Sequence, residues 1–169
     1  SYNPVSNMYL GSGAAPIREA LDAGVNVSVG TDGAASNNTT DYLESLKFAA
    51  LIQKGFTRDA ARITAPQTLQ MATNGGAKAA GMENRLGSIE VGKRADMFLF
   101  EPRKLKSTPM HDPYATIIYS SSQENVSTTI VNGKIVYSNG QFSCGIEERD
   151  LSDKINIELD KLRKQVAAL

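Results

Sequence analysis

Apolar residues in the first half of the chain recur every three or four positions, which is typical of helices with one buried face. Leu43, Leu46 and Ala50 form one such stripe, and Asp41 can cap it with Glu44 as its capping-box partner. Glycines end several stripes because they destabilise a helix interior. The expected helices occupy residues 16–23, 41–54, 58–63, 66–73 and 77–80, with the run Asn74-Gly75-Gly76 as a break before the last.

One segment of the first half has a different period. Residues 25–29 alternate valine with small polar residues, which predicts a strand, whereas residues 3–13 show no helical period and indicate a loop that leaves an upstream strand. Loop, helix and strand in this order are typical of a parallel βα unit. Asp32 follows the strand within a Gly-Thr-Asp-Gly run. The pattern therefore places a carboxylate at the C-terminal end of a strand, where active sites lie in α/β folds. Asp and Gly are also the commonest residues of an ordinary turn, so on these residues alone both interpretations stay open.

From Leu86 onward the pattern changes to short apolar and alternating runs, which favour β-structure. Residues 97–100 are wholly apolar and suit a buried strand, and Asn132-Gly133 is a strong hairpin signal. The expected strands occupy residues 97–100, 114–121, 127–131 and 134–137.

The tail returns to a helical period. Its apolar residues follow one another at steps of four, four, three, four and three from Leu151 to Leu169, and Ser152 offers a start signal. This stripe predicts one amphipathic helix. We expect it to dock on its own domain, with a coiled-coil seam as the alternative.

Composition narrows the class of protein. The 169 residues are too few for a complete (β/α)8 barrel of about 250 residues. Eighteen basic and 18 acidic residues give no net charge, which argues against a nucleic-acid partner. The single cysteine, Cys144, and the lack of any apolar run of roughly 20 residues predict a soluble, cytoplasmic protein without a membrane span. Because the chain opens at Ser1 without an initiator methionine, we expect a fragment or a processed piece.

Several of these segments resemble the amidohydrolase superfamily, and most closely its branch of S-adenosylhomocysteine and methylthioadenosine deaminases and triazine hydrolases. The similar segments are residues 3–7, 10–16, 21–25, 30–38, 92–96 and 131–134. The resemblance implies an α/β fold in three parts. Residues 1–85 would form the last βα units of a metal-dependent hydrolase (β/α)8 barrel, residues 86–145 part of a small β-sandwich, and residues 146–169 the C-terminal amphipathic helix.

The resemblance also implies a site. Asp32 matches the aspartate of barrel strand eight, which in the family ligates a divalent metal, zinc or iron, and accepts a proton from the water that the metal activates. Ser6, Asn7, Ser36 and Asn37 would surround the same opening. They can contact a substrate or satisfy loop backbone, and both interpretations stay open.

The other metal ligands of the family, mostly histidines, have no match in this chain. We interpret His111, the only histidine, as a surface residue, and Asp96 as the cap of a turn. Tyr2 stands where many family members have a histidine, so the substrate is left open.

The resulting hypothesis is that this chain is the C-terminal portion of an aminohydrolase that acts on a small purine-like or triazine-like ring. A chlorohydrolase or another ring C–N or C–Cl hydrolase is one alternative, and a non-catalytic structural or interaction module is the other. We expect the isolated chain to lack tight metal binding and turnover. Its unpaired strand edges and apolar tail predict a homo-oligomer.

Overall fold

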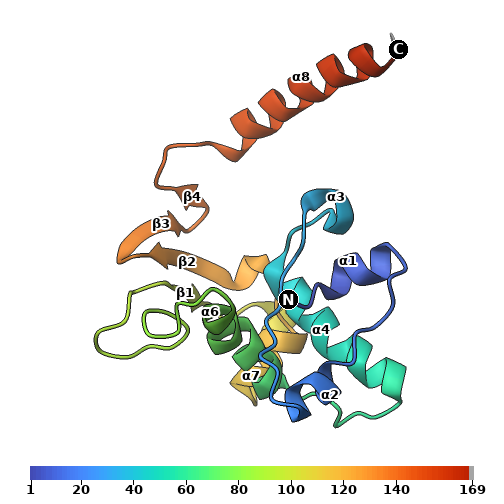
Figure 1. The fold of residues 1–169 in the computed structure, drawn as a ribbon. Coiled ribbons are helices and arrows are strands. Elements are labelled where there is room, and N and C mark those ends of the chain that lie inside the picture. Colours follow the sequence, from blue (N-terminus) through green and yellow to red (C-terminus); the bar gives the residue numbers. More distant parts are fainter. Residues whose placement is uncertain (168–169) are drawn as a thin grey trace.

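Helices make up most of the first half of the chain, and one small sheet follows them (Figure 1). The computed structural model describes residues 1–167. The α-helices are α1 (Pro4–Tyr9), α2 (Ile17–Asp22), α3 (Ala34–Asn37), α4 (Tyr42–Thr57), α5 (Ala65–Gln70), α6 (Gly76–Ala79), α7 (Pro113–Tyr119) and α8 (Glu148–Ala167). A π-helical turn, η1 (Met71–Gly75), joins α5 to α6, and two 3₁₀ turns are η2 (Leu105–Ser107) and η3 (Gln123–Asn125). The strands are β1 (Met97–Phe100), β2 (Val126–Val131), β3 (Lys134–Ser138) and β4 (Gln141–Phe142).

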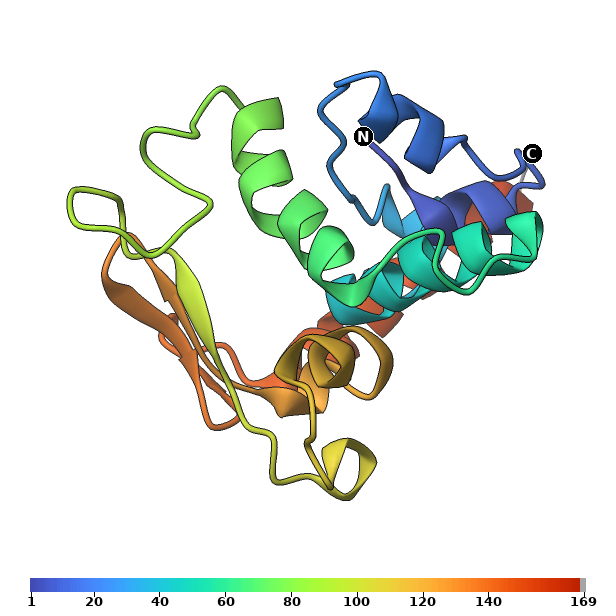
Figure 2. The same ribbon diagram turned by 90° about the horizontal axis from the view of Figure 1, so that it is seen from below.

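The helical part and the sheet lie side by side, as the view from below shows (Figure 2). The buried hydrophobic cluster belongs to the helical part, to residues 25–29 and to α7. Its members are Tyr2, Ile17, Val27, Val29, Leu43, Leu46, Ala49, Ala50, Ile63, Ala65, Met71 and Ile118. Within residues 1–167, no helix combines the length and the apolar character needed to cross a bilayer.

Helix α4 lies at the centre of this core and confirms the expected cap. The Asp41 carboxylate accepts the backbone N–H of Glu44 at 3.2 Å. The expected capping box is wrong, because the Glu44 carboxylate accepts from the Thr39 hydroxyl at 2.8 Å, and the Asp41 backbone N–H donates to the Thr39 hydroxyl oxygen instead of to Glu44. The predicted end at residue 54 is wrong, because α4 continues through Gly55 to Thr57 and stops where Arg58 adopts a left-handed φ of 55°. The helix expected at residues 58–63 is absent from the described chain, which forms turns there.

Helices α5 and α6 form one continuous rod through η1, so the predicted break at Asn74-Gly75-Gly76 is wrong. Both glycines keep helical φ angles of −61° and −63°. Gly75 packs directly on the backbone of residues 25–29: a Cβ there would lie 2.3 Å from the carbonyl oxygen of Val27. The Asn26 side chain also donates to the Gly75 carbonyl at 3.0 Å. The glycine thus permits a close approach and does not end the helix.

Residues 25–29 have a single bridge partner, Tyr2, which pairs in parallel with Val29. Two backbone bonds form this bridge: the Tyr2 N–H donates to Ser28 at 2.7 Å, and the Gly30 N–H donates to Tyr2 at 2.9 Å. The expected strand is therefore confirmed only at its C-terminal end. The loop expected at residues 3–13 is wrong in part, because Pro4 at the first position of α1 favours a helix too short to show a period.

The four strands form one antiparallel sheet in the order β1-β2-β3-β4. The predicted hairpin is confirmed: Asn132 and Gly133 connect β2 to β3 with φ angles of 50° and 76°. The Asp96 carboxylate accepts the backbone N–H of Asn132, as expected of a turn cap. The prediction that residues 97–100 form a buried strand is wrong as to burial, since Phe98 and Leu99 of β1 are 42% and 51% exposed. Strand β4 was not predicted.

The strand expected at residues 114–121 is a helix, α7. Asp112 caps it by accepting the backbone N–H of Tyr114 at 3.0 Å, and Pro113 occupies its first turn. The β-branched and aromatic residues of this run suggest a strand, but the cap and the burial of Thr116 and Ile118 against the core favour the helix.

The C-terminal helix α8 leads away from the rest of the chain (Figure 1). It begins at Glu148, not at Ser152, and Leu169 of the predicted stripe lies outside the described residues. The expected docking is wrong, because none of the described residues of α8 is buried. Its exposed apolar side chains are Leu151, Ile155, Ile157, Leu159, Leu162 and Val166.

Candidate metal and substrate site

Two stretches far apart in the sequence meet where the parallel bridge ends. The chain leaves Tyr2 into α1 and leaves Val29 toward Asp32, so both exits lie at the same edge. Ser6 of α1 and Asp32 are 26 residues apart, yet the Ser6 hydroxyl donates to Oδ2 of Asp32 at 2.6 Å. Ser6 is 2% exposed. The side-by-side exits thus bring a buried donor to the one carboxylate that the sequence predicts at this site.

Asp32 has an unusual backbone and an exposed side chain. Its φ of 62° is left-handed, a region that aspartate enters more readily than most residues. The backbone N–H of Gly33 donates to Oδ1 at 2.8 Å. The Ser6 bond first, then the Gly33 bond and more weakly the nearby Ser36 hydroxyl, hold the pKa of Asp32 below its ordinary value. The carboxylate is therefore ionised at neutral pH and faces solvent.

The loop after Asp32 is held by its own polar side chains. The Ser36 hydroxyl donates to the Gly33 carbonyl at 3.1 Å, and the Asn37 amide donates to the Thr31 carbonyl at 2.6 Å. Asn37 is 4% exposed. Both side chains thus satisfy backbone groups of the loop. The sequence had left open whether they do this or contact a substrate. Asn7 lies half-buried on α1, where its backbone bonds to Asn3 and Ser12.

The support beneath the site was not predicted from the sequence. Gly30 lies so close to Asn3 that a Cβ would be 2.4 Å from its Oδ1. The Tyr42 hydroxyl donates to the Val29 carbonyl at 3.1 Å and lies 3.3 Å from the Ala72 carbonyl. These contacts tie the end of residues 25–29 to the N-cap of α1 and, through Tyr42 of α4, to η1. The glycine before Thr31 was the only sequence signal for this close packing.

Asp32 fits the role of a single metal ligand. It is an ionised, solvent-facing carboxylate, and its two hydrogen bonds occupy only part of its acceptor capacity. Across residues 1–167, no three His, Cys, Asp or Glu side chains gather closely enough to hold a metal ion. His111 is exposed beside α7, and Asp96 caps the β2–β3 hairpin. Any further ligands would therefore have to come from outside the described residues.

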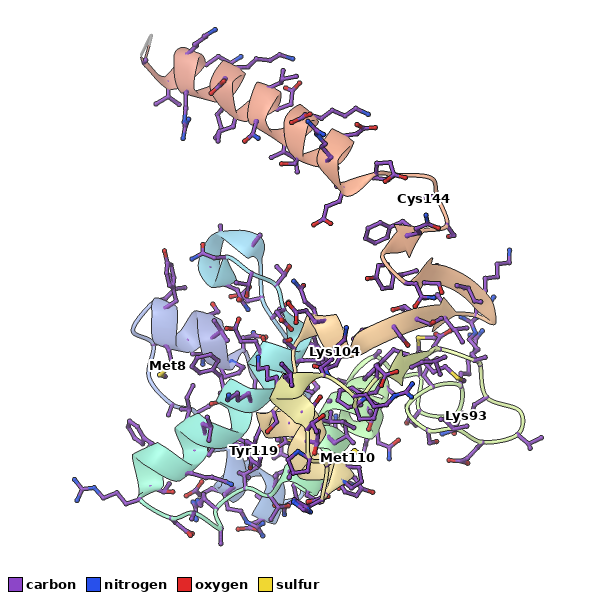
Figure 3. All side chains as sticks on the ribbon, turned by 180° about the vertical axis from the view of Figure 1, so that it is seen from behind. Met8, Lys93, Lys104, Met110, Tyr119 and Cys144 are labelled. Atoms are coloured by element: carbon purple, nitrogen blue, oxygen red, sulfur yellow. The ribbon has the colours of Figure 1, made fainter. Side chains whose placement is uncertain are left out.

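Two other features lie apart from Asp32. A hollow of about 430 Å³ is at the opposite end of residues 25–29, where Val25 and Asn26 line it with parts of α2 and η1. Cys144 is an exposed free thiol after β4, on the way to α8 and well away from Met8 of α1 (Figure 3).

The chain is similar to known proteins over most of its length. Residues 2–136 match the model of the family described as the amidohydrolase family. A 5-methylthioadenosine/S-adenosylhomocysteine deaminase of Moorella thermoacetica is 46% identical over 138 residues, which are 82% of this chain and 32% of that protein. The chain thus spans about a third of the length of the curated relatives it matches.

Two solved structures resemble the fold. An adenosine deaminase from Xanthomonas campestris with bound zinc has a TM-score of 0.92 and 34% identity, covering 96% of this chain and 37% of that one. An atrazine chlorohydrolase from Arthrobacter aurescens complexed with zinc has a TM-score of 0.82 and 31% identity, covering 90% of this chain and 34% of that one.

Proposed function

This chain belongs to the amidohydrolase family, and from that premise we propose that it is the C-terminal portion of a metal-dependent hydrolase that deaminates a purine-like or triazine-like ring. Its deaminase relatives, each about three times as long as the matched part, support this proposal. In it, residues 1–85 supply the last βα units of a barrel, residues 86–145 supply part of a β-sandwich, and residues 146–169 are the C-terminal part that contains α8.

One observation carries the proposal: an ionised carboxylate stands at the joint exit of two parallel chain segments, held there by Ser6 and Gly33. Asp32 would ligate the metal and accept the proton that the attacking water gives up. A divalent ion bound there would polarise that water and stabilise negative charge on the ring. Zinc is favoured over iron because two structural relatives contain zinc.

The remaining rim residues would contribute to substrate recognition. Asn7, half-buried on α1, is a proposed substrate contact. Ser36 and Asn37 can join it only if they share or release the bonds that they make to loop carbonyls. We therefore assign them mainly to the shape of the rim, and Ser6 to Asp32.

Loss of chloride instead of ammonia is the second candidate reaction. The structural likeness to an atrazine chlorohydrolase favours it, and the two reactions differ chiefly in the leaving group on the ring carbon. Ammonia release from a 6-aminopurine nucleoside and chloride release from a chlorinated triazine, measured side by side on the complete protein, separate the two.

Asp32→Asn in the complete protein tests the role of the carboxylate. The substitution keeps the shape of the side chain and removes its charge, so we expect loss of bound metal and of turnover. Asp96→Asn is the matched control, since Asp96 only caps the hairpin and an amide oxygen can still accept from Asn132. An Asp32→Asn protein that keeps its metal and more than about a tenth of wild-type kcat would refute the proposal, because a ligand role is worth several kcal/mol.

A further inference from the structure

We infer that Ser6 is a positioning residue that orients the Asp32 carboxylate for metal binding. The inference rests on the proposed role of Asp32 as a ligand and adds a second residue to it. The bond from Ser6 to Oδ2 is 2.6 Å long, within the range of hydrogen bonds from a hydroxyl to an ionised carboxylate.

The direction of the Ser6 hydroxyl sets it apart from the serine and threonine hydroxyls of α4 and α7. Ser45 and Thr57 on α4 donate to the carbonyl four residues earlier, at 3.0 and 2.7 Å. Thr116 on α7 does the same at 2.8 Å. This local bond is the common choice of serine and threonine inside helices. Ser6 instead reaches across to Asp32, on a segment that α1 meets only through the fold.

The two donors around Asp32 act on different oxygens. Ser6 holds Oδ2, and the backbone N–H of Gly33 holds Oδ1 at 2.8 Å. One bond to each oxygen fixes the plane of the carboxylate and leaves further acceptor positions free on both. Since the Asp32 backbone adopts a left-handed φ of 62°, such surrounding contacts also maintain a conformation that is unfavourable by itself.

Burial makes Ser6 a fixed donor. At 2% exposure its hydroxyl has little access to water, so the bond to Asp32 is its means of satisfying a buried polar group. Without that hydroxyl, Asp32 keeps the Gly33 bond but can rotate about it. Groups that hydrogen-bond to a metal ligand in this way change metal affinity by about 10–100-fold when they are removed.

The test compares Ser6→Ala with Ser45→Ala in the complete protein. Both substitutions delete a buried hydroxyl, because Ser45 is 0% exposed, but the Ser45 bond goes to the Asp41 carbonyl. Zinc dissociation constants from competition with a chelator should rise by about 10–100-fold in Ser6→Ala and stay at the wild-type value in Ser45→Ala. The visible spectrum of the Co²⁺-loaded protein should also change only in Ser6→Ala, since it reports on ligand geometry.

Equal zinc affinity in Ser6→Ala, Ser45→Ala and wild type would overturn the inference and would make Ser6 an ordinary buried serine. If Ser6→Ala does not fold, Ser6→Gly takes its place, because it also removes the hydroxyl and adds no group that binds zinc. Wild-type affinity in Ser6→Gly would equally overturn the inference. Asp32→Asn separates the two proposals: retained zinc there refutes the ligand role itself, whereas lost zinc there with unchanged affinity in Ser6→Ala refutes only the role of Ser6.

Discussion

Replacing Gly75 or Gly76 by alanine tests the packing that supports the site. A Cβ at Gly75 would lie 2.3 Å from the Val27 carbonyl oxygen, whereas ordinary contacts begin at 3.4 Å. Either η1 or residues 25–29 would have to move by about 1 Å, and such overpacking costs about 1–3 kcal/mol. A Cβ at Gly76 meets nothing within 4 Å. With the helical φ of Gly76, alanine should stabilise by about 0.5–1 kcal/mol.

The two substitutions are matched, since they add the same methyl group to adjacent helical residues. Thermal unfolding should place the midpoint of Gly75→Ala below wild type and that of Gly76→Ala above it. At about 2–4 °C per kcal/mol for a chain of this size, the two variants should differ by roughly 3–16 °C. Equal midpoints would refute the direct contact between η1 and the backbone of Val27. A lower midpoint for Gly76→Ala alone would mean that Gly76, and not Gly75, makes the close contact.

Two further predictions concern charge and assembly. The Arg103 guanidinium holds the pKa of Glu101 at about 2, so the stabilisation by this carboxylate is complete above its ordinary pKa of 4.5 and is lost as the pH falls toward 2. Glu101→Gln should make the unfolding free energy depend less on pH between 4.5 and 2. An unchanged pH dependence would contradict the ion pair. The exposed apolar stripe of α8 should make the 169-residue chain self-associate at micromolar concentration, as measured by sedimentation, and the double variant Leu159→Lys with Leu162→Lys should be a monomer. A sharp monomer peak for the wild-type chain would refute this prediction. An oligomer of the double variant would assign the association to the strand edges.

The elements that could be predicted from the sequence are those with strong local signals. Helix α4 combines a buried stripe with the Asp41 cap, and the β2–β3 hairpin has Asn132-Gly133 in left-handed conformations that other residues seldom adopt. In both cases the residues that determine the conformation are neighbours in the sequence. These local signals are sufficient to predict both elements, although distant contacts also stabilise them.

The elements that were missed depend on distant contacts. In the sequence alone Gly75 indicates a helix break, yet the backbone of Val27, 48 positions earlier, requires a residue without a side chain there. Helix α7 has the composition of a strand, but its Asp112 cap and its burial against the core decide otherwise. Propensity is a weak signal wherever packing opposes it. Helix α8 differs again: its helical period could be predicted, but its start at Glu148 and its lack of docking could not.

The same distinction applies to the site. Asp32 could be placed at a strand end because a carboxylate between glycines follows an alternating run, whereas its role as a metal ligand was implied by the family resemblance and stays a prediction. Its partner Ser6 could be placed near the opening, but its bond could not be predicted, because residues 3–13 were interpreted as a loop and the bond spans 26 residues. What brings the two together is the parallel pairing of Tyr2 with Val29. The orientation of the carboxylate is therefore determined by that pairing and by α1, and a Gly-Thr-Asp-Gly turn in another fold would not reproduce it.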